Sequence, residues 1–308
     1  MSSFAPRERR YWRPFTTLLL FLLTAVNGRI CVAAQRTWIG ANADWVDGVG
    51  AANWSPADEP DADDEAVFNT ANAVNLGSDN AILALTMSAG IDLSTNDFAL
   101  AVDGLVQLSG ASTNLFVNGS AGSVNADDVT INSGATLELR GGQLTLDEET
   151  GSSVLDINGG GTLAGNGVVK FADAPLLATA LLVNDGAITA LSRASNILMP
   201  PPTGALQIND SSIGGRVNLD GIGEAGLINV NRNQTLDLNV PMTDAFSGTL
   251  TLFQGSTFDS ISAWTLDAGS LVANNGATAG FGGSPAGPST IAGAAFTQTG
   301  GTISVVDT

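Results

Sequence analysis

Short segments with alternating apolar residues recur from about Ile82 to the end of the chain, and they restrict the fold more than any other feature. Every second residue is apolar, and Gly, Asn, Asp or Ser stand between the segments. Six examples are residues 134–139, 142–146, 204–208, 234–238, 248–252 and 301–305. A period of two is that of a β-strand with one buried face, and no helical spacing persists after residue 34. The sequence therefore predicts an all-β protein made of short strands.

The composition favours a solenoid over a sandwich or a barrel. Phe, Trp and Tyr make up only 6% of the chain, whereas Gly occurs 37 times. A sandwich core of this size would normally use more aromatic residues, while a parallel β-helix buries Leu, Val and Ile of each coil against the coils above and below. Leu137 and Leu163 are 26 residues apart with about three strand segments between them, which is close to one coil of a three-sided right-handed β-helix.

We expect three segments: a leader at 1–34, an N-terminal cap at 35–80 and the solenoid at 81–308. The cap segment holds Trp38, Trp45 and Trp54. A solenoid needs an atypical terminal unit because its first coil has no neighbour to cover the apolar cross-section, and bulky Trp can cover it. Residues 171–203, which include three consecutive prolines at 200–202, are expected to form a loop that projects from one coil.

The leader has the features of a secretory signal peptide. Four arginines precede an apolar run from Phe15 to Val26, and Val32-Ala33-Ala34 supplies the small residues that signal peptidase needs. We expect cleavage after Ala34 and a secreted protein, located outside the cell, on its surface, in the periplasm or on the outer membrane. A retained anchor is the alternative, but the run is shorter than the roughly 20 residues of a spanning helix.

Cys31 is the only cysteine, so its loss with the leader would leave neither a disulfide nor a thiolate site. A lipidated Cys31 is a second reading, although Gly28-Arg29-Ile30 fits a lipoprotein signal poorly.

Charge excludes some partners. The formal net charge is −19, and removal of five Arg and one Glu with the leader makes it about −23. Such a surface repels nucleic acid and anionic lipid, whereas it is compatible with divalent cations and neutral glycans. The simpler explanation is that the acidity keeps a β-rich extracellular protein soluble.

Without His, and with Cys31 removed, the mature chain lacks the residues of hydrolytic triads and of most zinc sites. A glycosidase or a polysaccharide lyase based on carboxylates stays open as an alternative. Asp147, Glu148 and Glu149 form the densest acidic group of the repeat region, but a solvated turn explains them as well. Arg140, Lys170 and Arg216, the basic residues that a lyase could use, are isolated in the sequence.

Two weak site hypotheses fall in the cap segment. Carboxylates between residues 58 and 65 could bind Ca²⁺, a hard ion that prefers oxygen ligands, although a hydrated loop explains the run too. The candidate ligands are Asp58, Asp61, Asp63, Asp64 and Glu65. Trp38, Trp45 and Trp54 could form a platform for sugar rings, or they could be buried as a cover of the first coil.

Residues 159–169, Gly-Gly-Gly-Thr-Leu-Ala-Gly-Asn-Gly-Val-Val, resemble the autotransporter-associated β-strand repeat of bacterial passenger domains. The opening from Trp38-Ile-Gly40 to Asn53-Trp54 is similar to the start of many secreted bacterial β-repeat proteins. The resemblance implies a right-handed, pectin-lyase-like β-helix, export across the inner membrane and an adhesin-like setting.

The sequence thus predicts an exported structural or adhesin-like solenoid without a catalytic role, with a glycan or a cell surface as partner. The alternative is a carbohydrate-binding or polysaccharide-cleaving β-helix. The chain ends with strand-like residues 296–308, so we expect either a continuation beyond Thr308 or self-association through the last coil.

Overall fold

The computed structural model describes residues 33–40, 43–45, 51–147, 153–172, 179–190, 205–210, 216–220, 227–239, 248–260, 264–266, 270–274, 276–281, 291–293, 296–298 and 302–306. The chain divides into two compact units, Met1–Ala33 and Ala34–Thr308, and every described strand belongs to the second. The expected signal peptide up to residue 32, with Cys31, lies outside the described residues. None of the helices in the described ranges could span a membrane.

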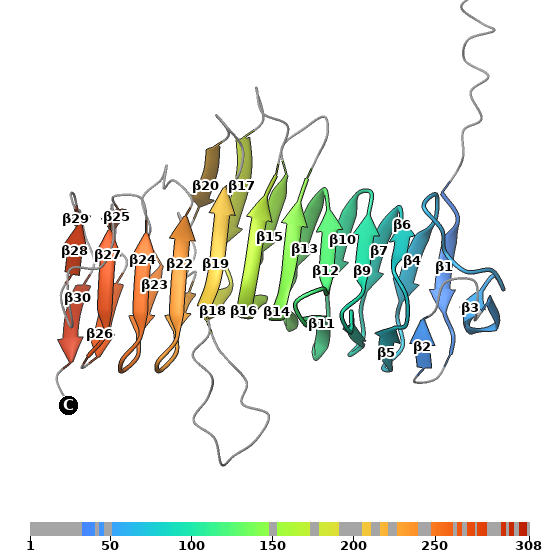
Figure 1. Cartoon of the computed structure of the whole chain (residues 1–308), viewed down its shortest axis with the longest axis horizontal. Helices are drawn as coiled ribbons and strands as arrows, with labels where there is room; N and C mark the ends of the chain where they lie inside the picture. The colour runs from blue at the N-terminus through green and yellow to red at the C-terminus, as the bar shows by residue number, and fades with distance from the viewer. Residues whose placement is uncertain are drawn as a thin grey trace, which may run out of the picture. The chain divides into compact units, whose positions relative to one another are not determined.

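The strands of the second unit wind into stacked coils with three faces (Figure 1). In one coil the chain passes through β7 (Ala84–Met87), β8 (Asp92–Ser94) and β9 (Ala99–Val102) before it reaches β10 (Leu105–Leu108). Since β10 pairs in parallel with β7, the chain has returned to the same face one coil later. This connectivity confirms the predicted parallel β-solenoid of the right-handed type, in which crossovers between parallel strands have their usual hand.

The first face is a parallel stack whose N-terminal edge carries one antiparallel strand, β3 (Trp54–Ser55). Its parallel members are β1 (Gln35–Trp38), β4 (Glu65–Phe68), β7, β10, β13 (Asp128–Ile131), β15 (Val154–Ile157), β17 (Thr179–Asn184) and β20 (Arg216–Asp220).

The second and third faces belong to one sheet, because β14 (Ala135–Leu146) and β16 (Thr162–Phe171) run through both of them. The second face also contains β2 (Ala43–Trp45), β5 (Ala73–Leu76), β8, β11 (Thr113–Asn118), β18 (Ala187–Ala190), β21 (Leu227–Val230), β23 (Thr249–Leu252), β26 (Ser270–Asn274) and β30 (Thr302–Val306). The third face also contains β6 (Asn80–Ile82), β9, β12 (Ser123–Ala126), β19 (Ala205–Asp210), β22 (Thr235–Asn239), β24 (Thr257–Ser260), β27 (Thr278–Phe281) and β28 (Ile291–Gly293). A short separate pair joins β25 (Trp264–Leu266) to β29 (Phe296–Gln298).

Aliphatic ladders fill the interior, as the alternating pattern predicts. On the first face, Leu85, Val106, Val129, Leu155 and Leu182 are register partners in successive coils, and each is fully buried. Each coil therefore covers the apolar surface of its neighbours, which is how a solenoid forms one core from units that have none alone.

Leu137 and Leu163 are direct register partners on the second face, so the predicted spacing of 26 residues is one coil. Coils elsewhere have other lengths. Glu65 pairs with Ala84, 19 positions later, whereas Ala187 pairs with Leu227, 40 positions later. Insertions of different size between strands explain why the repeat is imperfect in sequence.

The turns between the first and second faces are held by small polar residues. Asn132 donates from its side-chain amide to the Leu108 carbonyl one coil earlier, at 3.2 Å, and the Ser109 hydroxyl donates to the Met87 carbonyl at the same distance. The same two carbonyls also accept the backbone N–H groups of Asn132 and Ser109, so each side chain adds a second bond between adjacent coils at the corner.

Two segment boundaries differ from the expectation. The segment 35–80 is not separate from the solenoid, since β1, β4 and β7 are consecutive parallel partners. The loop expected at 171–203 instead contains β17 and β18, each paired to the coils on both sides. The prolines at 200–202 lie outside the described residues. The only helical element within the described ranges is a single 3₁₀ turn, η1 (Ala51–Asn53).

Candidate functional site

Four aromatic rings close the N-terminal end of the core. Trp38, Trp45 and Trp54 are each 1% exposed, and Phe68 is fully buried. Trp54 lies at the centre, with ring centroids 5.0 Å from Trp38 and 5.2 Å from Trp45 in edge-to-face contacts. Phe68 lies 5.3–5.8 Å from all three indoles. We call these four residues the cap cluster.

The cap cluster presents no ring face to solvent. Burial of Trp38, Trp45 and Trp54 therefore favours the covering role over a sugar platform, which would need exposed rings. None of the three indole N–H groups has a hydrogen-bond acceptor in the part of the chain that the structure describes. Packing of the rings, rather than polar bonding, holds the cluster together.

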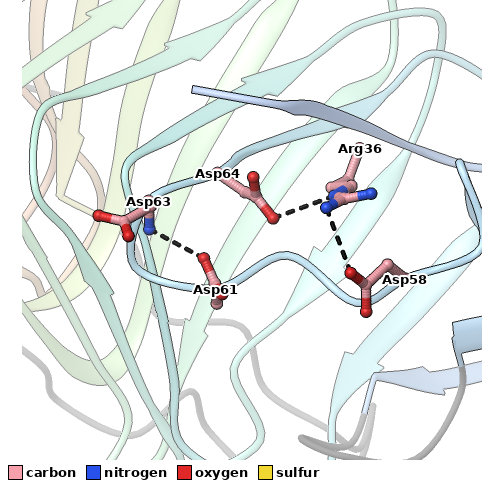
Figure 2. A network of polar contacts seen from close by, with 5 residues as sticks. All are labelled: Arg36, Asp58, Asp61, Asp63 and Asp64. Carbon is pink, nitrogen blue, oxygen red and sulfur yellow. Dashed lines mark hydrogen bonds and ion pairs between the residues drawn. The ribbon is translucent and has the colours of Figure 1, made fainter. Parts of the chain in front are cut away.

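Beside the cap cluster, Arg36 binds two carboxylates of the acidic run (Figure 2). Its Nε donates to Asp64 Oδ2 at 3.0 Å, and its Nη2 donates to Asp58 Oδ2 at 3.3 Å. The Asp64 side chain is 8% exposed and that of Asp58 is 70% exposed, so the two bonds lie in very different surroundings. The hydrogen bond to Asp64 raises the pKa of Arg36, while burial acts in the opposite direction.

The other acids of the run have separate structural partners. Asp61 Oδ1 accepts from the backbone N–H of Asp63 at 3.0 Å, as in an Asx turn. Glu65 accepts from the Thr86 hydroxyl at 2.8 Å and from the Gln35 amide at 3.2 Å. The five carboxylates do not converge on one point, and in the described ranges no group of three or more His, Cys, Asp or Glu could hold a metal ion. The guanidinium of Arg36 occupies the place between Asp58 and Asp64 where the calcium hypothesis needed a cation.

Of the acidic group in the repeat region, Asp147 is exposed just after β14. Glu148 and Glu149 lie outside the described residues. Lys170 lies on β16, where its register partner is Thr145, two positions before Asp147. Arg216 begins β20, which pairs with β17 on the first face.

Four other aspartates bind to the next coil. Asp92 Oδ1 accepts from the Asn114 amide at 2.6 Å, and Asp44 Oδ1 accepts from the Asn75 amide at 3.3 Å. Two others accept backbone N–H groups: Asp79 from Ala99 at 2.8 Å and Asp128 from Val154 at 2.7 Å. We call such bonds coil staples, because each joins residues that are 20 to 31 positions apart in sequence.

One ion pair on the second face was not expected from the sequence. Arg140 Nη2 donates to Glu138 Oε2 at 3.1 Å, and the guanidinium carbon lies 3.7 Å from the centre of the Phe116 ring. Glu138 is 1% exposed, although it alternates with the inward-facing Leu137 and Leu139. Arg140 was interpreted as isolated, whereas its partner is two positions earlier on the same side of β14. The signal in the sequence was Glu-x-Arg within a strand, since residues i and i+2 share a face.

The comparisons with known proteins returned nothing similar to this chain, whether family models, curated proteins or solved structures were searched.

Proposed function

We propose that the protein is an exported structural or adhesin-like β-solenoid without a catalytic role. One observation carries the proposal: four carboxylates along the solenoid serve as coil staples. In each of them, one carboxylate oxygen accepts a hydrogen bond from the adjacent coil, and the four do not face a common centre. They are Asp44, Asp79, Asp92 and Asp128. A catalytic pair would instead need two carboxyl groups that face one substrate.

Export is supported by the position of the first strand. β1 begins at Gln35, the residue that follows the expected cleavage site. The backbone N–H of Glu65 donates to the Ala34 carbonyl at 2.9 Å, so cleavage after Ala34 removes one acceptor at the start of the sheet. Loss of this terminal bond should lower the stability only slightly, because water at the new chain end can accept the hydrogen bond from the Glu65 N–H.

The resemblance to the autotransporter-associated repeat is supported by what its glycines do. A Cβ at Gly161 would stand 2.2 Å from the Ile131 carbonyl oxygen, and one at Gly165 would stand 1.9 Å from the Leu139 carbonyl oxygen. Both contacts are with the preceding coil. The motif is therefore one in which close stacking of coils requires glycine, as expected for a repeat that recurs along a solenoid.

The export part is tested by expressing the full chain in a Gram-negative host and fractionating the cells. We expect a processed protein outside the cytoplasm whose N-terminal residue is Gln35. An unprocessed chain that stays in the cytoplasm would contradict the proposal. A variant with Ala33 and Ala34 changed to Asp is the matched control, because it keeps the apolar run and removes only the cleavage site.

The second test separates the adhesin-like role from the rival carbohydrate-cleaving role. The purified protein is incubated with immobilised polysaccharides and with whole bacterial cells, and both retention and release of reducing ends are measured. We expect retention without release. Reducing ends released by the native protein would overturn the absence of a catalytic role.

A further inference from the structure

Two carboxylates face each other across adjacent coils in the C-terminal half. Asp237 on β22 and Asp259 on β24 are register partners on the third face. Leu236 and Leu238 flank the first and Phe258 and Ser260 flank the second, and all four are at most 1% exposed. Since side chains alternate along a strand, both carboxylates point outward on the same side. Neighbouring strands are about 4.8 Å apart, which brings the two acids close together.

This pair differs from the coil staples. In those, a carboxylate meets an amide, a hydroxyl or a backbone N–H of the next coil. Here a carboxylate meets a carboxylate, and two such groups cannot both ionise at short range without mutual repulsion. Asp259 Oδ1 is buried and has no hydrogen-bond partner in the described ranges, so one oxygen of the pair has lost its water without a replacement.

The two strands on either side of Asp259 carry no basic residue. On β22 the only ionisable group is Asp237, and on β27 the register partner of Asp259 is Gly280, which has no side chain. Arg232 lies exposed in the turn before β22. Burial raises the pKa of Asp259 above its ordinary value, the charge of Asp237 raises it further, and a hydrogen bond from the backbone N–H of Ser260 opposes both.

We propose that Asp259, which faces Asp237 on the adjacent coil, takes up a proton in mild acid, and that this protonation makes the C-terminal coils more stable there than at neutral pH. A proton on Asp259 removes the repulsion and supplies an O–H donor to the Asp237 carboxylate. This protonation is independent of the proposed function, because it changes the stability of the protein and does not involve a binding partner.

The direction of the effect follows from linkage. Because the pKa of Asp259 is higher in the folded than in the unfolded chain, the folded chain binds the proton more tightly. The resulting stabilisation is fully present below the unfolded pKa, which is about 3.9 for Asp, and it is lost as the pH rises through the folded pKa. The melting temperature of the native protein relative to Asp259→Asn should therefore rise as the pH falls.

The experiment compares the melting temperatures of the native protein, Asp259→Asn, Asp237→Asn and the double variant between pH 7.5 and 4. Asp156→Asn is the matched control, because Asp156 lies outward on β15 and its register partners, Thr130 and Val183, carry no charge. We expect the difference between the native protein and Asp259→Asn to change by about 2–4 °C over this range. Asp156→Asn should not show a change of this sign.

A second measurement tests the proposal in the native protein and in Asp237→Asn, even if Asp259→Asn folds poorly. Carbon-13 shifts of selectively labelled Asp carboxyls report the titration of Asp259 directly in the native protein and in Asp237→Asn. We expect Asp259 to titrate at lower pH once Asp237 is neutral, though still above its ordinary value because burial remains. An unchanged titration in Asp237→Asn, or a pH-independent difference in melting temperature, would overturn the proposal.

Discussion

Arg36 Nε lies 3.0 Å from Asp64 Oδ2, in a bond that ties the first strand to the turn just before β4. The Asp64 side chain is 8% exposed and Arg36 is 16% exposed, so water competes little for this pair. We expect Asp64→Asn to lower the melting temperature by about 3–6 °C, because a buried charge-assisted hydrogen bond is weakened. Asp58→Asn is the control, since Asp58 is 70% exposed, and exposed pairs contribute little. Equal losses in the two variants would show that burial of Asp64 does not matter.

The cap cluster should respond strongly to truncation at its centre. Trp54 contacts Trp38, Trp45 and Phe68, so Trp54→Ala leaves a large cavity at the end of the core. We expect a loss of about 3–5 kcal/mol in the free energy of unfolding, measured by denaturant titration. Indole fluorescence of the remaining rings should shift to the red as water enters. Ile39→Ser, at a side chain that is 59% exposed, should change neither quantity.

Two glycines of one motif should tolerate alanine very differently. Gly165 has φ +113°, and a Cβ there would stand 1.9 Å from the Leu139 carbonyl oxygen, whereas a Cβ at Gly159 would find its nearest neighbour at 3.9 Å. We expect Gly165→Ala to cost roughly 2–4 kcal/mol through backbone strain and displacement of the neighbouring coil. Gly159→Ala should be nearly neutral. Similar stabilities of the two variants would contradict the stacking geometry between β14 and β16.

The pair of Glu138 and Arg140 gives a test of a buried charge. Arg140→Ala removes the guanidinium, which is 34% exposed, from a carboxylate that is 1% exposed, and we expect a loss of about 1–3 kcal/mol. The double variant Glu138→Gln/Arg140→Ala should recover part of that loss, because a neutral amide replaces the buried carboxylate. Urea unfolding of the single and double variants measures the coupling. If the double variant is less stable than Arg140→Ala, the loss arises from packing on Phe116 instead.

The strands and their stacking could be predicted from the sequence, because both follow from local patterns. All six alternating segments overlap described strands, among them β14, β22 and β23. Leu137 and Leu163 proved to be neighbours because buried positions of a solenoid recur once per coil. Such a ladder can be recognised in the sequence, because each coil contacts only the coils next to it and the buried positions therefore recur at about the coil length.

The strands β17 and β18 were missed for the opposite reason. Their residues follow a proline at 175 and precede three prolines at 200–202, so local composition indicated a loop. In the structure they are held by pairing to β15 and β20 on one face and to β16 and β21 on the other. Pairing with coils on both sides outweighs a weak local preference for strand.

The sequence by itself determined the fold class, the aliphatic core and the coil length at Leu137, because alternation and spacing encode which side chains face inward. Only the tertiary structure decided what the polar residues do. Arg36 meets Asp64 from 28 positions away, and Asp237 meets Asp259 one coil later. Whether a carboxylate faces an amide, a guanidinium or another carboxylate depends on the register between coils. That register is set by insertions whose lengths follow no periodic pattern, so the charges cannot be paired until the coils are stacked.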